Sequence, residues 1–437
     1  MEHAVGHGQR DGGRSRWGHV GKCTGLVVSD TRGGWPWPEG WSSGGAVDAL
    51  STVTVTVTVS VTVMVPVIGM VTVANDGWGE LMRAGRTVAV FGASGHTGRF
   101  VVAELRARGF VPLLVGRNAE KLLALVAGEA GPEPEPEPGQ GPEGWVRVAS
   151  VEEPASLDRA FAGADAVVNC AGPFAETAAP VIEAALRAGI PYVDVAAEIE
   201  ANLDTFAEFG AKARAAGVVV VPAMAFFGGL GDLLVTAATE AAGWSAADEA
   251  HIAYGLSGWH PTAGTRDAGA VSRQRRGGRR VRYADGRLEY RDDAAPATKW
   301  DFPEPMGTRA VIGEFSMADI VTVPSHLTVT EVRTYMTVEA ARDLAAPETP
   351  APAAVDAHGR SAQTFVVDVV VRSGDVERRA TARGQDIYAV SAPLAVEAVR
   401  RVIEGRVKGT GVLSAGAAFD AADFLRALSG HVSVEVE

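Results

Sequence analysis

Cysteine is scarce in this chain of 437 residues, in which only Cys23 and Cys170 occur. Two cysteines so far apart form neither a disulfide framework nor a zinc-ligand spacing, which favours a reducing, cytoplasmic location. The nine histidines show no H-E-x-x-H or Cys/His pattern. We therefore expect no metal site.

Positive charge is also in short supply. Lys and Arg total 40 against 53 Asp and Glu, which gives a net charge of −13. Nucleic acids and anionic membranes bind basic surfaces, so we expect neither as the main partner. The hydrophobic share of 47% is ordinary for a globular protein, and the length allows two or three domains.

Residues 1–82 differ in composition from the rest and form the first predicted region. Residues 1–48 lack periodicity and the apolar core of a secretory signal, and a Val/Thr repeat follows at 51–63. Positions 49–75 carry no charge, but β-branching, Pro66 and Gly69 disfavour a transmembrane helix. A membrane anchor, a disordered or strand-adding extension and a non-native leader all remain open. We expect the leader, with Met70 or Met82 as the true start.

The strongest functional signal is the glycine-rich turn GASGHTGR at 92–99, between a predicted strand at 88–91 and a helix ending near residue 108. Gly92 allows a sharp turn, Gly95 lets a pyrophosphate approach, and Gly98 lets the helix pack close to the sheet. The free N–H groups at the helix start favour phosphate. The predicted cofactor contacts here are Gly92, Ser94, Gly95, His96, Thr97 and Gly98.

The end of the next predicted strand, 110–115, indicates which cofactor binds. An NAD site usually has an acidic residue there for the ribose, whereas this chain has Arg117 followed by Asn118. A guanidinium suits the 2′-phosphate of NADP. We predict NADP(H) as the cofactor, with Glu120 as a weaker competing ribose ligand.

Strand and helix patterns alternate with short connections up to about residue 247, which is typical of a doubly wound parallel sheet. Longer alternating segments follow, and the clearest pair, 364–372 and 376–382, flanks a Ser-Gly-Asp turn. We predict an α/β protein of three parts after the leader. These are a Rossmann-type NADP-binding domain at 83–247, a mostly antiparallel α+β substrate domain at 248–386, and C-terminal helices at 387–437 that pack back on the first domain.

Six sequence blocks, in this order, resemble the saccharopine dehydrogenase-like reductases, a family that includes the trans-acting enoyl reductases. They are GASGHTGR (92–99), VGRNAEKL (115–122), VVNCAGPF (167–174), AGIPYVDVAAE (188–198), VVPAMAFFGGLGDLL (220–234) and GTGVLSAGAAFDAADFLRAL (409–428). The resemblance covers about 83–430 and implies a Rossmann domain, a second α+β domain that shapes the substrate pocket, and NADP(H) as hydride carrier. Many members have an Asp-Ser pair where this chain has Phe227 and Gly228, so their substrate preference is not carried over.

Ligands of doubly wound sheets bind beyond the carboxyl ends of the strands. Asn169, Gly172 and Pro173 follow a predicted strand at 166–170, so we expect them to border the nicotinamide ribose. Asp194 and Glu198 follow the next strand and either transfer a proton or bind a cationic group, or else form a salt bridge or helix cap. Cys170 lacks a basic partner nearby in sequence and is interpreted as a small buried residue.

Tyr254 and His260 lie in the segment that opens the second predicted domain. Either could protonate the atom beside the hydride acceptor if this segment folds over the nicotinamide, and a structural role for each stays open. Six arginines flank the Gly277-Gly278 pair and either meet an acidic substrate or, as we expect, belong to a solvated hairpin. They are Arg273, Arg275, Arg276, Arg279, Arg280 and Arg282.

These observations predict an NADPH-dependent oxidoreductase that reduces a C=C, C=N or C=O bond of an unidentified small metabolite. Short-chain dehydrogenase chemistry needs a Tyr followed four residues later by Lys, and none of the six tyrosines fits. A non-catalytic NADP-binding regulatory protein remains the alternative. We expect a small-molecule substrate and neither a nucleic-acid nor a membrane partner, and we leave a homodimer open.

Overall fold

The computed structural model describes residues 16–18, 28–30, 85–128 and 145–437. The chain divides into two units, Met1–Met82 and Arg83–Glu437. In the first unit the described residues form two short antiparallel strands, β1 (Arg16–Gly18) and β2 (Val28–Asp30). The Val/Thr repeat at 51–63 and the two alternative starts, Met70 and Met82, lie outside the described residues.

A seven-stranded parallel sheet carries the glycine-rich turn in the second unit, with the strand order β17-β8-β7-β6-β3-β4-β5. Its strands are β3 (Thr87–Phe91), β4 (Val111–Gly116), β5 (Val146–Val148), β6 (Ala166–Asn169), β7 (Tyr192–Asp194), β8 (Val219–Val221) and β17 (Gly411–Val412). Without β17 this is the order of a doubly wound dinucleotide-binding sheet, so the predicted fold class is confirmed.

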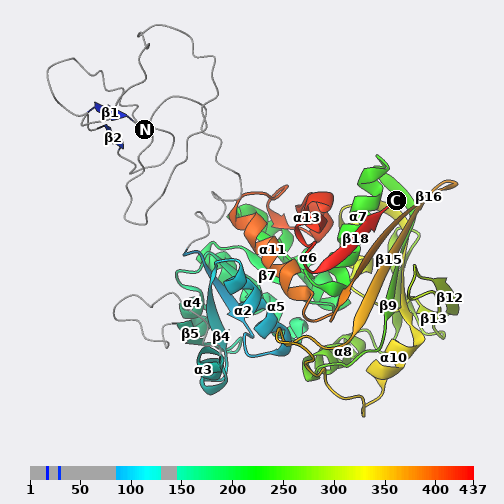
Figure 1. Cartoon of the computed structure of the whole chain (residues 1–437), viewed down its shortest axis with the longest axis horizontal. Helices are drawn as coiled ribbons and strands as arrows, with labels where there is room; N and C mark the ends of the chain where they lie inside the picture. The colour runs from blue at the N-terminus through cyan, green and yellow to red at the C-terminus, as the bar shows by residue number, and fades with distance from the viewer. Residues whose placement is uncertain (1–15, 19–27, 31–84, 129–144) are drawn as a thin grey trace, which may run out of the picture. The chain divides into compact units, whose positions relative to one another are not determined.

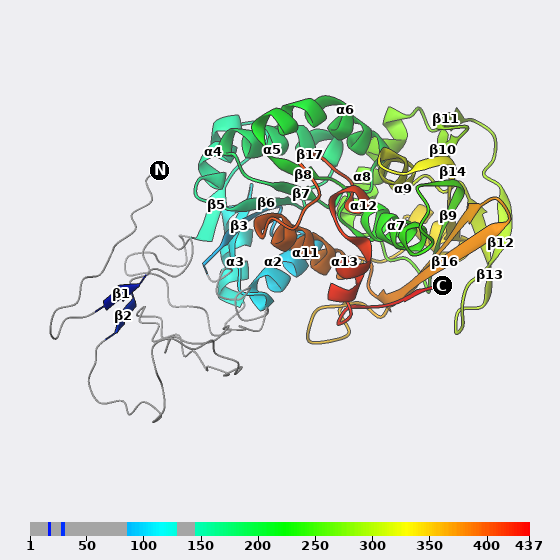
Figure 2. The same cartoon turned by 90° about the horizontal axis from the view of Figure 1, so that it is seen from above.

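Helices cover both faces of this sheet, with α2, α3 and α11 on one face and α4, α5 and α6 on the other (Figure 2). Their bounds are α2 (His96–Ala107), α3 (Ala119–Gly128), α4 (Pro154–Phe161), α5 (Phe174–Ala188), α6 (Ile199–Ala216) and α11 (Ser391–Ile403). Successive strand residues point to opposite faces, so Val88 and Ala89 are buried in different apolar clusters. The strands are apolar on both sides because both faces are covered.

A second, nine-stranded sheet follows in the chain, in which β9 and β14 form the parallel pair and the other described pairs are antiparallel. This confirms the mostly antiparallel second sheet and its hairpin at 373–376. The strands are β9 (Ala246–Leu256), β10 (Arg280–Ala284), β11 (Arg287–Arg291), β12 (Ala297–Asp301), β13 (Thr308–Gly313), β14 (Thr328–Thr337), β15 (Thr364–Ser373), β16 (Val376–Gln385) and β18 (Val432–Val436).

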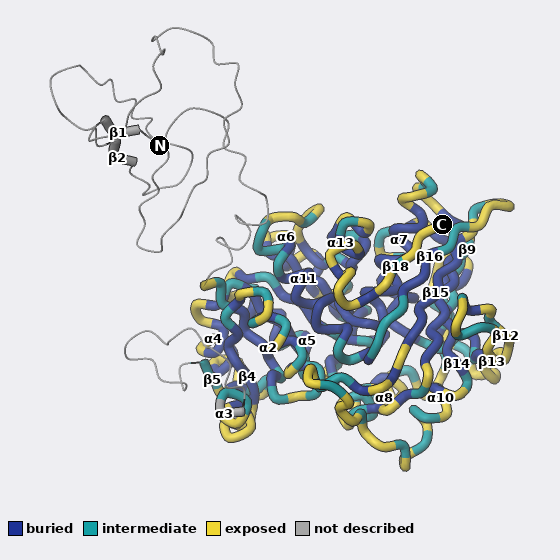
Figure 3. Tube along the Cα trace, viewed as in Figure 1, coloured by how far each residue is buried: buried dark blue, intermediate teal, exposed yellow. Residues whose placement is uncertain are grey.

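Shorter helices connect and cover the two sheets, and α7 lies beside the long strands β15 and β16 (Figure 1). They are α7 (Gly231–Ala241), α8 (Ala263–Arg275), α9 (Asp319–Thr322), α10 (Val338–Ala345), α12 (Ala415–Ala418), α13 (Ala421–Ala427), the π-helical turn η2 (Phe226–Leu230) and the 3-10 turn η3 (Val323–Ser325). One apolar cluster contains Val88 of β3, Leu394 of α11 and Ile252 of β9. The two sheets therefore share a core, seen as the dark-blue interior of Figure 3.

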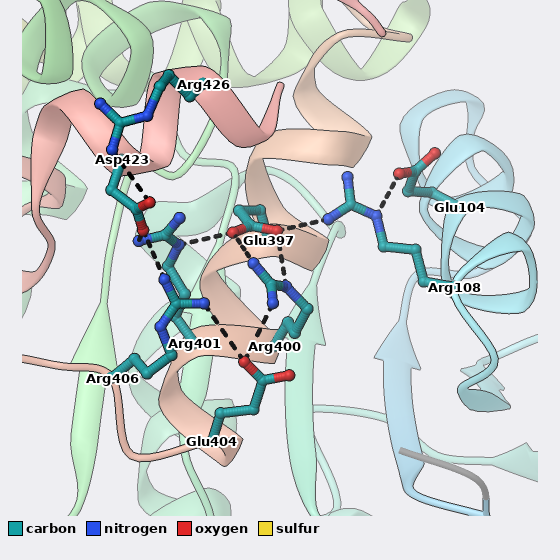
Figure 4. Close-up of polar contacts among 9 residues, drawn as sticks. All are labelled: Glu104, Arg108, Glu397, Arg400, Arg401, Glu404, Arg406, Asp423 and Arg426. Atoms are coloured by element: carbon teal, nitrogen blue, oxygen red, sulfur yellow. Dashed lines mark hydrogen bonds and ion pairs between the residues drawn. The ribbon is translucent and has the colours of Figure 1, made fainter. Parts of the chain in front are cut away.

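An ion-pair network ties the C-terminal segment to the first helix of the parallel sheet (Figure 4). Glu397 of α11 accepts hydrogen bonds from Arg108, just after α2, and from Arg401, both at 2.6 Å. Arg401 also pairs with Asp423 of α13 at 2.8 Å. The side chains of Glu397 and Arg401 are each 2% exposed. Removing one partner would leave a buried charge uncompensated, so the network fixes α11 against α2.

The strand β17 extends the parallel sheet beyond β8, and its pairing brings residues 411 and 412 beside 219 and 220. Sequence periodicity did not predict it because two residues are too few to show alternation. Within the described ranges, no helix combines the length and apolar character needed to cross a membrane.

Candidate functional site

A cavity of about 1560 Å³ opens at the carboxyl ends of the parallel strands. The glycine-rich turn and the segments that follow the parallel strands line one part of its wall, and α8, α10 and the segment at the end of β13, residues 312–317, line another part. Ligand pockets usually measure roughly 300–1,000 Å³. The cavity thus has room for a dinucleotide and a second ligand.

The glycine-rich turn has the geometry of a phosphate-binding loop. Gly92 has a φ of +86°, and a Cβ at this position would lie 2.9 Å from the Cβ of Ala171. A Cβ on Gly98 would lie 2.2 Å from the carbonyl oxygen of Gly92, which makes Gly98 a packing residue. Gly95 precedes α2, and no side chain caps the helix start. The first N–H groups of α2 are therefore free to bind an anion.

His96 begins α2 and lies on the cavity wall. Its ring meets Phe100 and Tyr388 edge-on, with ring centroids 5.3 and 5.2 Å away. Burial lowers the pKa of His96, so the imidazole is neutral at physiological pH. Its buried Nε2 has no hydrogen-bond partner among the described residues, and such an atom is costly unless a ligand or water satisfies it.

Arg117 directly follows β4 and is exposed on the same wall, where it makes no ion pair with the described residues. Asn118 also lines the wall, and its side chain accepts a hydrogen bond of 2.9 Å from the N–H of Lys121 at the start of α3. Lys121 is a second cation on this wall that sequence reasoning missed. Its position in the first turn of the helix that follows the strand could have indicated this from the sequence. Together Arg117 and Lys121 suit a 2′-phosphate.

The structure divides the predicted cofactor contacts into two groups. Residues on the wall are Gly92, Ser94, Gly95, His96, Thr97, Arg117, Asn118 and Gly172. Gly98, Asn169 and Pro173 lie outside it. Asn169 is fully buried, where it accepts a hydrogen bond from the N–H of Ala171 at 3.0 Å and donates one to the Tyr192 hydroxyl at 3.2 Å. It shapes the turn before Gly172 and does not reach the cavity, because side-chain direction at a strand end depends on the fold.

Glu198 is the predicted proton-transfer residue that the structure brings to the wall. Both carboxylate oxygens accept from the N–H of Phe174, at 3.1 Å, at the start of α5. Burial raises the pKa of Glu198 to about 7, although the hydrogen bond from Phe174 opposes the shift. Both protonation states are therefore accessible near neutral pH, as general acid or base chemistry requires.

Asp194 lies beneath the wall, where it forms neither the expected salt bridge nor a helix cap with the described residues. It accepts hydrogen bonds from the Tyr192 hydroxyl at 2.8 Å and from the N–H groups of Ala196 at 3.0 Å and Ala223 at 2.8 Å. These bonds join the ends of β7 and β8. Cys170 reaches the wall half-buried, and burial raises the pKa of its thiol, so it remains protonated.

Neither Tyr254 nor His260 is placed on the described wall. The Tyr254 side chain is fully buried, and its hydroxyl donates to the carboxylate of Asp319 at 2.8 Å. His260 is exposed, with Nδ1 3.3 Å from the carbonyl oxygen of Pro350. The same segment reaches the cavity through Trp259 and Thr262 instead.

Tyr388 is a wall residue that sequence reasoning missed. Its hydroxyl lies 3.2 Å from the indole N–H of Trp259 and 3.2 Å from the backbone N–H of Thr262, and it accepts from both. It thereby fixes the segment before α8 beside the nucleotide end of the cavity. No local pattern marks Tyr388, because the fold alone brings residue 388 to this place.

The arginine-rich segment differs from the expected hairpin. Gly277 and Gly278, with φ of +65° and +76°, follow the end of α8, and the β10–β11 hairpin turns later, at 285–286. Four of the six arginines lie on the cavity wall, namely Arg273, Arg276, Arg279 and Arg280. Arg275 and Arg282 lie off it. Among the described residues, no three His, Cys, Asp or Glu side chains lie close enough to hold a metal ion.

Residues 88–221 match the family model described as the saccharopine dehydrogenase NADP binding domain. This part of the chain is thus similar to the NADP-binding domain of saccharopine dehydrogenases. The match confirms the predicted family resemblance and the predicted cofactor, NADP. The buried Nε2 of His96, the uncapped start of α2 and the two cations after β4 fit that cofactor.

Two curated relatives show the extent of the similarity. The saccharopine dehydrogenase-like oxidoreductase of Bos taurus is 30% identical over 147 residues, which is 32% of this chain and 34% of the relative. A probable mitochondrial saccharopine dehydrogenase-like oxidoreductase of Arabidopsis thaliana is 31% identical over 147 residues, 32% of this chain and 31% of the relative. The chain thus matches about a third of the length of these relatives.

The fold extends the similarity beyond that domain. Apo saccharopine dehydrogenase (L-Glu forming) from Saccharomyces cerevisiae superposes with a TM-score of 0.53 and 12% identity, covering 80% of this chain and 100% of that one. At this identity the likeness shows a shared fold. It carries no information on the substrate.

Proposed function

We propose that this protein is an NADPH-dependent oxidoreductase that reduces a C=C, C=N or C=O bond of a small metabolite. One observation carries the proposal: the cavity continues from the NADP-binding turn past Glu198 to a wall formed by the second sheet. A site for the cofactor alone would not need this continuation. Hydride transfer requires an acceptor beside the nicotinamide, and the continuation offers that space.

Each part of the wall has a distinct role in this proposal. The start of α2 and Gly95 bind the pyrophosphate, while Arg117 and Lys121 bind the 2′-phosphate. The bound cofactor supplies the hydride. Glu198 in its protonated form gives a proton to the acceptor, and Phe227 and Trp259 exclude water from this end of the cavity.

The alternative is an NADP-binding regulatory protein without turnover. It predicts cofactor binding but no consumption of NADPH with any acceptor. Steady-state NADPH oxidation should therefore be measured with a panel of enones, imines and ketones, using the Glu198→Gln variant as a control for background reduction. Turnover that depends on Glu198 supports the enzyme. Tight NADPH binding without oxidation of any acceptor supports the regulator.

We further propose the domain division 83–247, 248–386 and 387–437, with a small-molecule substrate and a cytoplasmic location. The scarcity of cysteine supports the location, whereas the name of the Arabidopsis relative includes a mitochondrial one. Cell fractionation distinguishes these two. A homodimer is tested by the mass in solution.

A further inference from the structure

We propose that the substrate is an amphipathic anion, with its carboxylate or phosphate bound by Arg273 and Arg279 and its apolar body against apolar side chains of η2, α10 and the segments that follow β9 and β13. This inference rests on the proposed function and adds the substrate class. The substrate class is inferred from the charged and apolar side chains that line the cavity beyond the NADP-binding residues.

The cavity wall is strongly basic although the whole protein carries a net charge of −13. Glu198 and Glu314 are the acidic side chains on the described wall. The basic side chains on it are Arg117, Lys121, Arg266, Arg273, Arg276, Arg279 and Arg280. A wall of this sign concentrates anions and repels cationic substrates.

Three of these arginines are engaged within the protein. Arg266 donates to the carbonyl oxygens of residues 344, 346 and 349 at 3.2, 2.9 and 3.1 Å. Arg276 donates to Ser272 at 2.7 Å and pairs with Glu200 at 3.5 Å. Arg280 pairs with Glu314 at 2.6 Å. Each of them has a structural partner and is not free for a ligand.

Arg273 and Arg279 have fewer partners: within the described residues neither has a carboxylate partner, and neither donates to three carbonyl oxygens as Arg266 does. The guanidinium of Arg279 lies 4.8 Å from the centre of the Tyr290 ring, and its Nε donates to the carbonyl oxygen of Arg276 at 3.1 Å. These contacts hold the side chain in place without neutralising it. Arg117 and Lys121 follow β4 and serve the cofactor, so Arg273 and Arg279 are left for a second anion.

The wall beyond the cofactor also carries several large apolar side chains. It contains Phe227 of η2, Trp259 after β9, Phe315 and Met317 after β13, and Leu344 of α10. Trp259 and Phe227 also pack against each other, with ring centroids 5.4 Å apart. Apolar side chains at this end favour a ligand with a hydrocarbon or ring body, since removing apolar surface from water is favourable.

Stabilisation of the α8 C-terminus would explain only one of these two arginines. Basic residues in the last turn of a helix stabilise its C-terminus, and Arg273 and Arg275 both lie in the last turn of α8. Arg275, however, lies off the wall and pairs with Asp204 at 2.6 Å. Arg279 lies beyond the helix. Arg275 therefore serves as a matched control for Arg273.

The test is calorimetric titration of the NADP⁺-loaded protein with decanoate, decyl phosphate, neutral decanamide and short-chain butanoate. We expect the better of the two long anions to bind at least about tenfold more tightly than decanamide and butanoate. Arg273→Gln and Arg279→Gln should each weaken anion binding about tenfold and leave decanamide unchanged. Arg275→Gln should change the affinity for neither the anions nor decanamide. The better anion identifies the head group as carboxylate or phosphate.

Equal affinity for decanoate, decyl phosphate and decanamide, no binding of any probe, or an equal loss in Arg275→Gln would overturn the inference. NADPH affinity is measured on the same variants and should be unchanged. If the wild-type protein fails to bind NADPH, the proposed function fails instead. The two failures are therefore separable.

Discussion

Replacing Arg117 by Asp should change the cofactor preference from NADPH towards NADH. Arg117 is exposed at the end of β4 and has no ion pair with the described residues. Its removal therefore breaks no described internal contact, and the variant should keep its fold. The new carboxylate repels a 2′-phosphate and accepts hydrogen bonds from ribose hydroxyls.

The expected magnitude follows from the exposure of the site. A hydrogen bond to a charged group contributes about 1.5–3 kcal/mol, and solvent screening places Arg117 near the lower end. Lys121 remains nearby and retains part of the attraction. We therefore expect the dissociation constant for NADPH to rise about tenfold to thirtyfold. The NADH affinity should rise by less, because only the ribose contact is gained.

Fluorescence titration with both cofactors measures the change. Arg309→Asp is a suitable control, because Arg309 is an exposed arginine of β13 whose described hydrogen bond goes to a backbone carbonyl. It alters the net charge equally. An unchanged NADPH affinity in Arg117→Asp, or the same loss in Arg309→Asp, would refute the assignment of Arg117 to the 2′-phosphate.

Three other perturbations probe catalysis, stability and the turn. Glu198→Gln should lower kcat. It should also abolish the fall in activity as the pH rises through about 7, where wild-type Glu198 loses its proton. A variant that keeps the wild-type pH profile would exclude Glu198 as the proton donor. Glu397→Gln should lower the free energy of unfolding by up to about 3–5 kcal/mol, because three arginines lose the buried carboxylate that they share and keep their outer partners, Glu104, Glu404 and Asp423. Burial alone would raise the pKa of Glu397, but the arginines lower it below its usual value. The carboxylate therefore stabilises the fold fully above about pH 4.3, and this stabilisation is lost as the pH falls. An unchanged denaturant midpoint in Glu397→Gln at neutral pH would contradict this. Gly98→Ala should weaken NADPH binding and lower Tm, since its Cβ would lie 2.2 Å from the Gly92 carbonyl oxygen, whereas Gly430→Ala, with no atom within 4 Å, should change neither.

The sequence was sufficient for features that depend on local geometry. The glycines at 92, 95 and 98 follow one strand and start one helix, so their spacing predicts the tight strand-to-helix turn that the structure has there. Arg117 could be predicted for the same reason, because the end of the second strand always lies beside that turn. The doubly wound parallel sheet also followed from the alternation of strand and helix patterns.

Features that depend on tertiary packing could not be predicted in this way. Whether Asn169 or Tyr254 points into a cavity or into the core is set by the neighbouring strands and helices, and both point into the core. Tyr388 and the arginines of α8 reach the wall from distant parts of the chain. The two-residue strand β17 exists only because β8 offers it a free edge.

The central claim is that the cavity beside the NADP-binding turn is a site of hydride transfer. Its most direct test is single-turnover reaction of the protein with NADPH that carries deuterium at both C4 positions and with the acceptor panel, followed by mass spectrometry of the acceptor. If hydride is transferred in this cavity, the reduced acceptor should contain one deuterium for each NADPH oxidised, and this transfer should be lost when Arg117→Asp weakens cofactor binding at limiting NADPH. Bound NADPH that remains reduced with every acceptor, or oxidation without deuterium in the product, would contradict it.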